Sequence, residues 1–384
     1  MSKQPFTVHI PQATIDDLRE RLKHSRWPDE VADAGWDYGA NLAYLKELAD
    51  YWQNQFDWRV QEQKLNTFTH FRANVDGIGI HFIHERGKGP DPMPIILTHG
   101  WPDSFYRMVK IIPLLTDPAS HGGNSADAFD VIVPSLVGFG FSDRSTIRGM
   151  TVSRIADLWA RLMTETLSYR RFAAHGGDIG GGVTQRLAMS HSEKLAGIHL
   201  TDVNYPYFSQ RPTNLTEAEQ KYVQASTAFL FQEGAYAMME ATKPQTISYG
   251  LNDSPIGLAA WIIEKFRAWS DCNGDVERRF SKDELLTNLT IYWAKGTTSA
   301  ADSSNRLYYE EMHNPTPPTY EEHSSVPTAV ALFPKDITPA PREWAERTLN
   351  VQRWTQMPRG GHFAALEEPE LLAEDIRAFF RPLR

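Results

Sequence analysis

Residues 172–180 read Phe-Ala-Ala-His-Gly-Gly-Asp-Ile-Gly, an apolar run followed by an aspartate set among glycines. The run 172–176 predicts a buried strand, and residues 182–190 predict a helix. A sharp strand-to-helix turn has room only for small residues around its tip, which gives the pattern Gly-x-nucleophile-x-Gly. The pattern alone is weak in a chain with 25 glycines, but its place between a strand and a helix makes it specific. We therefore predict that Asp178 occupies the tip of this turn, rather than an ordinary exposed turn.

An aspartate at this position selects a particular chemistry. Its carboxylate is already ionised at neutral pH, and the positive end of the following helix favours that charge. Attack by a carboxylate on a saturated carbon forms an ester, which water can cleave at the carbonyl, whereas a serine would be left as a stable ether. Asp178 therefore predicts an alkylating substrate, either an epoxide or an alkyl halide.

Strands and helices alternate along much of the chain. The predicted strands are 66–74, 78–84, 94–98, 130–134, 172–176 and 196–201, with helices at about 104–116, 151–168 and 182–190. Apolar strands separated by helices indicate a parallel sheet covered on both faces. Strand character returns at 328–334 and about 352–357 after a long, aromatic-rich, helical interruption. This pattern predicts an α/β-hydrolase fold with a mostly parallel sheet and a helical lid insertion.

The same pattern gives four segments. Residues 1–65 form an N-terminal extension, 66–205 the first part of the core, 206–325 the lid, and 326–384 the second part of the core. Residues 1–58 are predicted to be helical, and Leu45, Leu48 and Trp52 fall on one helix face. We expect that face to pack on the core.

The partners of the nucleophile should follow it in the order acid, then histidine. Arg359-Gly-Gly-His362-Phe follows the last predicted strand, and His362 is the candidate base that activates water. Asp336 ends the strand before it and is the favoured orienting acid. Asp202, which ends the strand after Asp178, is the rival, and Glu343 is a more distant alternative.

A developing oxyanion needs two N–H donors, one from the residue after the nucleophile and one from an earlier loop. Ile179 supplies the first. His99-Gly-Trp101-Pro-Asp-Ser104 follows strand 94–98, so the N–H of Trp101 is the second, and the Trp101–Pro102 bond is expected to be cis. An epoxide oxygen also needs a proton donor, for which tyrosine is suited. Residue chemistry alone does not choose among the tyrosines of the lid: Tyr207, Tyr222, Tyr236, Tyr249, Tyr292, Tyr308, Tyr309 and Tyr320.

Composition restricts the partners and the location. The formal net charge of −9 argues against nucleic acid or an anionic membrane surface as the main partner. No apolar run is long enough to span a bilayer, the first residues do not resemble a secretory signal, and Cys272 is the single cysteine. We expect a soluble cytoplasmic protein that binds a small molecule, without a membrane anchor, metal or cofactor.

Distinctive segments of this chain resemble the microsomal-type epoxide hydrolases over nearly the whole length. They include Arg26-Trp-Pro-Asp-Glu30, the HGWPDS and RGGHF segments, and the lid stretch from Glu233 to Ala260. The resemblance implies a helical cap, no cofactor, often a homodimer, and two acid tyrosines, which by motif are Tyr236 and Tyr308, with Tyr309 as the neighbouring alternative to Tyr308.

This chain also departs from the family pattern. Ile179 stands where an aromatic residue is common, Asp103 where HGWPGS has glycine, and Val137 where PSLPGFG has proline. Substrate preference therefore cannot be transferred from the family.

The favoured hypothesis is an epoxide hydrolase that forms a covalent alkyl ester on Asp178 and releases a vicinal diol. One alternative is a haloalkane-type dehalogenase with the same nucleophile, which Ile179 disfavours because its side chain cannot donate to a halide. The other is a catalytically inactive hydrolase fold that only binds a ligand.

Overall fold

The computed structural model describes residues 2–203, 212–294, 307–313 and 323–384. Within them, one sheet has the order β1-β2-β3-β5-β4-β6-β7-β8-β9. The strands are β1 (Lys3–Phe6), β2 (His70–Val75), β3 (Ile78–Glu85), β4 (Met93–Thr98), β5 (Phe129–Pro134), β6 (Phe172–Gly176), β7 (Leu195–Leu200), β8 (Ser324–Leu332) and β9 (Leu349–Gln356). The strands from β5 to β9 in this order pair in parallel, and β1, β2 and β3 are antiparallel. The predicted mostly parallel sheet is confirmed.

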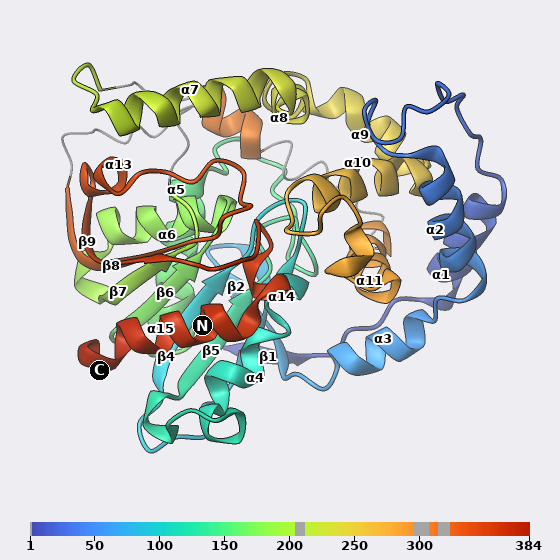
Figure 1. Cartoon of the computed structure of the whole chain (residues 1–384). Coiled ribbons are helices and arrows are strands. Elements are labelled where there is room, and N and C mark those ends of the chain that lie inside the picture. Colours follow the sequence, from blue (N-terminus) through green and yellow to red (C-terminus); the bar gives the residue numbers. More distant parts are fainter. Residues whose placement is uncertain (1, 204–211, 295–306, 314–322) are drawn as a thin grey trace.

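Two pairs of helices cover the parallel part of the sheet (Figure 1). One pair is α4 (Ile111–Thr116) and α15 (Pro369–Phe380), and the other is α5 (Val152–Arg161) and α6 (Ile179–Ser190). Every residue of β5, β6 and β7 is buried, as expected for strands covered on both faces. The carboxyl ends of β4, β6, β7 and β8 meet at one edge, where loops can carry polar side chains.

The N-terminal segment is not wholly helical. Residues 3–6 form β1, which extends the antiparallel side of the sheet at its edge, so the prediction of helix over 1–58 is wrong there. This four-residue strand buries no side chain fully, so it leaves no periodic apolar pattern in the sequence. Helices α1 (Gln12–Lys23), α2 (Leu42–Asn54) and α3 (Trp58–Leu65) follow it.

The apolar face of α2 is buried as predicted, with Leu45, Leu48 and Trp52 all nearly inaccessible to solvent. It lies against helices of the insertion, α10 (Pro255–Ala268) and α11 (Lys282–Ala294), which Figure 1 shows beside the blue N-terminal helices. The expectation that this face packs on the core is therefore wrong. The indole of Trp52 donates to Thr290 on α11 at 3.1 Å. The extension therefore braces the insertion as well as joining the sheet.

Helices α7 (Glu217–Gln232), α8 (Ala235–Thr242), α9 (Pro244–Asp253), α10 and α11 lie between β7 and β8 in the chain. Residues 307–313 are also helical. The other short elements are α13 (Arg342–Glu346), α14 (Ala364–Glu367), a π-turn at Leu162–Thr166, and the 3-10 turns η1 (Phe105–Met108), η2 (Pro118–His121), η3 (Ser125–Asp127), η5 (Ser192–Lys194), η6 (Val276–Arg278) and η7 (Arg381–Leu383). Among the helices described, none combines the length and apolarity needed to cross a membrane.

Candidate active site

The turn around Asp178 has the geometry that its glycines predict. β6 ends at Gly176, α6 begins at Ile179, and Asp178 between them has φ +59° and ψ −130°. Non-glycine residues rarely adopt positive φ, and such strain is concentrated at functional sites. A Cβ at Gly176 would lie 2.1 Å from the Gly180 carbonyl oxygen, and a Cβ at Gly180 would lie 2.0 Å from that of Thr98. Only glycine fits at either position.

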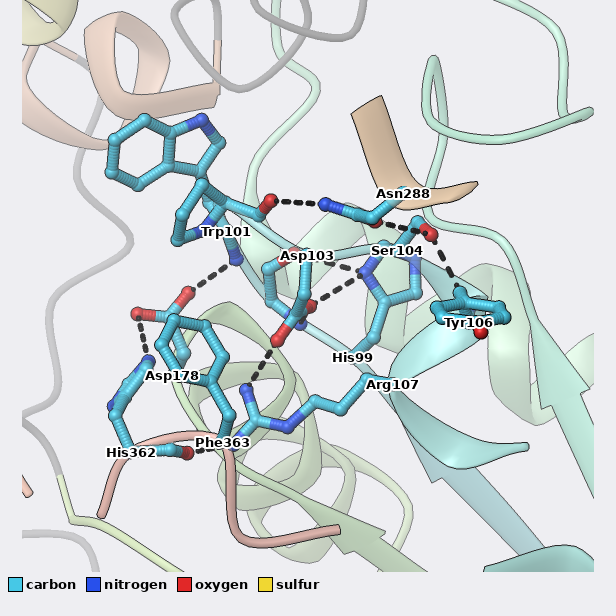
Figure 2. Close-up of polar contacts among 12 residues, drawn as sticks. His99, Trp101, Asp103, Ser104, Tyr106, Arg107, Asp178, Asn288, His362 and Phe363 are labelled. Atoms are coloured by element: carbon cyan, nitrogen blue, oxygen red, sulfur yellow. Dashed lines mark hydrogen bonds and ion pairs between the residues drawn. The ribbon is translucent and has the colours of Figure 1, made fainter. Parts of the chain in front are cut away.

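The carboxylate of Asp178 points inward, towards the groups predicted to accompany it (Figure 2). The Trp101 N–H donates to its Oδ1 at 2.8 Å, and the Ile179 N–H also hydrogen-bonds to it. Burial raises the pKa of Asp178, while the nearby His362 and the two N–H groups oppose that rise. Both predicted oxyanion donors therefore face this carboxylate, and the Trp101–Pro102 bond is cis as expected.

His362 lies between two carboxylates. Its Nδ1 is 2.7 Å from Oδ1 of Asp336, and its Nε2 is 3.6 Å from Oδ2 of Asp178. Burial alone would lower the pKa of His362, but the charge and hydrogen bond of Asp336, aided by Asp178, raise it to about 9. The two carboxylates therefore favour the imidazolium, and loss of the charge on Asp178 would favour the neutral imidazole, the form that can accept a proton.

The two rival acids occupy different places. Oδ2 of Asp202 accepts the backbone N–H of Asp178 at 2.5 Å, so Asp202 supports the turn rather than the imidazole. Burial raises the pKa of Asp202 to about 7, and the charge of Asp336 adds to this. Glu343 instead accepts from the hydroxyl of Thr216, 3.2 Å away. Of the three candidates, Asp336 is the one placed to orient His362.

Glu367 holds the loop that carries His362, a role that sequence reasoning missed. Its carboxylate accepts the backbone N–H groups of Gly361, Phe363 and Asp271 at 3.1, 3.0 and 2.8 Å. Burial raises the pKa of Glu367 to about 7, and these donors oppose the rise. A carboxylate close in sequence to a glycine-rich loop was the only signal that could have indicated this role.

Two tyrosines of the lid reach the nucleophile. The Tyr236 ring, on α8, is stacked on the Trp101 indole with centroids 4.8 Å apart and planes 10° apart. Tyr308 is partly buried. Desolvation, together with the charges of Tyr236 and Asp178 and a hydrogen bond to Tyr236, raises its pKa well above the ordinary value. Tyr309 turns away, stacks on His313 with centroids 4.0 Å apart, and lines a cavity of about 630 Å³.

The other lid tyrosines lie elsewhere. Tyr222 packs on the Trp344 ring, Tyr249 is exposed, and Tyr292 donates to the Asp103 carbonyl at 2.7 Å. Tyr207 and Tyr320 fall outside the described residues. Tyr236 and Tyr308 are hydrogen-bonded to each other, and Tyr236 stacks on the residue whose N–H binds Asp178.

Helix α11 fixes the loop that carries the Trp101 N–H. Asn288 donates to the Pro102 carbonyl at 3.0 Å and accepts from the Ser104 hydroxyl at 2.9 Å (Figure 2). With the Tyr292 bond, these contacts tie the loop to the insertion. The loop is therefore held rigidly before any substrate enters.

The described residues contain one group with metal-ligand atoms close together, formed by Asp202, Asp336 and His362. Each already has a polar partner, since Asp202 binds the Asp178 N–H and Asp336 binds the imidazole. The arrangement fits a charge-stabilised histidine, and we assign it no metal.

Comparison with known proteins agrees with this geometry. Residues 3–108 match the family model described as epoxide hydrolase N terminus, and residues 93–247 match the α/β hydrolase fold. Epoxide hydrolase 1 of Sus scrofa is 37% identical over 98% of this chain and 88% of its own length. The chain belongs to the epoxide hydrolase family. A protein of Stigmatella aurantiaca is 44% identical over 99% of this chain and 85% of its own length.

Solved structures agree. The Aspergillus niger epoxide hydrolase has a TM-score of 0.84 at 30% identity, covering 100% of this chain and 97% of that one. The juvenile hormone epoxide hydrolase of Bombyx mori has a TM-score of 0.84 at 28% identity, covering 100% of this chain and 94% of that one. The α/β-hydrolase fold and the epoxide hydrolase activity predicted from the sequence are both confirmed by these relatives.

Proposed function

We propose that this epoxide hydrolase opens its substrate in two steps, through an ester on Asp178. The observation that carries the proposal is the placement of the Asp178 carboxylate between the His362–Asp336 pair and the Trp101 N–H. Tyr236 is stacked on Trp101 and hydrogen-bonded to Tyr308, whose pKa the charge of Asp178 raises. In the first step Oδ2 or Oδ1 of Asp178 attacks an epoxide carbon and the C–O bond of the ring breaks. Tyr236 and Tyr308 hold the departing oxygen, and one of them gives it a proton.

The first step changes the electrostatics of the second. Ester formation removes the negative charge of Asp178, which had helped to raise the pKa of both His362 and Tyr308. The imidazolium of His362 becomes more acidic, so it can return a proton to the tyrosinate that the first step leaves. The neutral imidazole is then free to act as the base. His362 then takes a proton from water, and the resulting hydroxide attacks the ester carbonyl.

The tetrahedral intermediate carries its charge on an Asp178 oxygen. The N–H groups of Trp101 and Ile179, which already bind this carboxylate, stabilise that charge. Each donor of this kind contributes roughly 3–4 kcal/mol in comparable sites. Collapse of the intermediate breaks the bond between the carbonyl carbon and the alkyl oxygen. The departing alkoxide takes the proton of the new carboxyl group, which releases the diol and leaves Asp178 ionised again.

A dehalogenase would need side-chain donors for a halide beside the nucleophile. Ile179 offers only its backbone N–H there, and the paired tyrosines instead suit an epoxide oxygen. We therefore propose that residues 206–325 form a lid that supplies the acids. A homodimer, expected from the resemblance, is part of the same proposal.

The test is a single turnover with excess enzyme in ¹⁸O-labelled water. Attack of water on the ester carbonyl puts the label into the Asp178 carboxylate and leaves the first diol unlabelled. Label found only in the diol would rule out the ester. Asp178→Ala should be inactive, and His362→Gln should accumulate an adduct of substrate mass on Asp178, whereas the exposed His121→Gln should turn over normally.

A further inference from the structure

A buried chain of polar contacts joins the two loops that flank Asp178 (Figure 2). Oδ1 of Asp103 accepts the backbone N–H of Gly100 at 3.0 Å, and its Oδ2 accepts from Nη1 of Arg107 at 2.7 Å. Nη2 of the same guanidinium donates to the backbone carbonyl of His362. One ion pair thus connects the loop that contains the Trp101 N–H to the backbone of His362, the proposed base.

Both charges are almost fully removed from solvent. Arg107 is 2% exposed and Asp103 is 1% exposed. A buried ion pair is weak evidence for stability, because desolvation can offset its attraction and apolar side chains of similar size often do as well. The pair also includes Asp103, one of the three positions where this chain departs from the family pattern. A role at the active site explains its presence better than a role in folding does.

We propose that Arg107 and Asp103 form a positioning pair. It fixes the Trp101 N–H and the His362 imidazole relative to each other, as hydrolysis of the ester requires. The inference rests on the proposed function, because it assigns the pair to the second step. Its geometric part is the continuous path from the Gly100 N–H to the His362 carbonyl. Neither residue of the pair needs to touch the substrate.

The cation also acts on the charge of His362. The charged groups that face the imidazole are Asp336, Asp178, Asp202 and Asp103, which favour the imidazolium, and Arg107, which opposes it. While Asp178 is ionised the carboxylates prevail. Once Asp178 is esterified, its negative charge no longer stabilises the imidazolium. The positive charge of Arg107 then contributes more to the net effect on His362, which favours the neutral imidazole that hydrolysis requires.

The experiment compares Arg107→Met/Asp103→Asn with the wild-type enzyme. The double variant removes both charges together, so it leaves no unpaired buried ion, and the new amide oxygen can still accept the Gly100 N–H in place of the Asp103 carboxylate. Rapid quenching followed by intact mass measurement gives the rates of ester formation and ester hydrolysis separately. Hydrolysis should slow by on the order of 10²-fold, since small displacements of catalytic groups have effects of that size. Ester formation should change by less than about fivefold, so the ester accumulates.

A pH profile of ester hydrolysis separates the geometric effect of the pair from its electrostatic effect on His362. The double variant removes Arg107, which contacts the His362 carbonyl, and Asp103, which does not contact His362. The loss of the cation should therefore outweigh the loss of the anion and shift the pH midpoint of ester hydrolysis upward. Arg107→Lys, which keeps a charge but not the forked contact, should slow hydrolysis with the midpoint near that of wild type. A double variant that folds normally and hydrolyses the ester at the wild-type rate, with an unchanged midpoint, would overturn the proposal. So would an equal loss in both steps.

The matched control is Arg381→Met/Asp127→Asn. This pair also joins an arginine fork to a buried aspartate, with contacts of 2.6 and 3.0 Å, but it lies at the C-terminal 3-10 turn. Both rates should stay within about twofold of wild type. Failure of His362→Gln to accumulate the ester would refute the proposed function itself, whereas normal accumulation there with no effect of the Arg107 variants would refute only this inference.

Discussion

The phenol of Tyr236 lies parallel to the indole of Trp101, with centroids 4.8 Å apart. Trp101 therefore acts at two points, since its backbone N–H binds Asp178 while its ring supports a proton donor of the lid. Trp269 packs between Tyr236 and His362, with its ring centroid 5.2 Å from that of Tyr236 and 5.4 Å from that of His362. Aromatic packing thus sets the lid acid, the nucleophile and the base relative to one another.

This stack predicts the effect of removing one hydroxyl. Tyr236→Phe keeps the ring and loses the donor, so ester formation should slow by about 10²-fold, at the lower end for a general acid because Tyr308 remains. Stopped-flow or rapid-quench measurement of adduct formation checks this, and the free energy of unfolding should be nearly unchanged. Tyr249→Phe, at an exposed lid position, serves as the control. An unaltered rate of ester formation in Tyr236→Phe would remove Tyr236 from the mechanism.

The separate places of Asp336 and Asp202 predict different losses. Asp336→Asn should slow ester hydrolysis by roughly 10³–10⁴-fold, as the loss of an orienting acid does in hydrolytic triads. Asp202→Asn keeps an oxygen for the Asp178 N–H, so its effect should stay within about tenfold. Comparison of the two hydrolysis rates by rapid quench shows which aspartate orients His362. A larger loss in Asp202→Asn would make Asp202 the acid that serves His362.

Local sequence was sufficient to predict the parts of the site that each loop carries by itself. Asp178, His362 and Asp336 follow strands, and a parallel sheet brings the ends of its strands to one edge whatever the details of packing. Contacts made across the fold were not predictable. Arg107 and Glu367 act through backbone groups of the His362 loop, and backbone acceptors and donors carry no mark in the sequence.

The same distinction applies to the fold. The central strands have apolar runs and were predicted within a few residues, whereas β1 depends on an available edge of β2 and not on its own pattern. The packing of α2 on α10 and α11 likewise follows from the path of the lid insertion, which the sequence leaves open. An amphipathic face shows that a partner exists and does not show which one.

Glu240 predicts an unusual dependence of stability on pH. It lies on α8, is fully buried, and within the described residues neither carboxyl oxygen has a hydrogen-bond partner. Burial raises its pKa well above 4.5, and the charge of Asp178 raises it further. The nearby Trp261 indole opposes the rise, although its N–H does not reach either oxygen with hydrogen-bond geometry. Because the folded pKa lies above the unfolded one, the unfolded chain loses this proton first as pH rises. Glu240 therefore lowers the free energy of unfolding progressively above the unfolded pKa.

Glu240→Met should remove that penalty. We expect the free energy of unfolding to rise by about 1–3 kcal/mol at pH 8, the cost of an unsatisfied buried polar group, with a smaller gain at pH 5. Urea denaturation at the two pH values measures it, and the exposed Glu233→Met is the control from the same lid. A loss of stability in Glu240→Met, or a larger gain at pH 5 than at pH 8, would show that the carboxyl has a partner.

The space between Gly100 and the Asp178 side chain is too small for a Cβ at position 100. A Cβ at this position would lie 2.3 Å from Oδ1 of Asp178 and 2.5 Å from its Cβ, distances that no real contact tolerates. Gly100→Ala must therefore displace either Asp178 or the loop that carries the Trp101 N–H. We expect a loss of activity of about 10²-fold or more, from a displacement of about 1 Å, and a loss of stability of about 1–3 kcal/mol from overpacking.

Steady-state diol formation and urea denaturation measure both effects of Gly100→Ala. The control is Gly250→Ala, because a Cβ there meets nothing within 4 Å and the residue lies in helix α9. That change should leave activity intact and stabilise the helix by roughly 0.5–1 kcal/mol, the difference in helix propensity between glycine and alanine. Wild-type turnover in Gly100→Ala would mean that the loop yields without disturbing Asp178. The contact between the Trp101 N–H and the nucleophile would then not limit the rate.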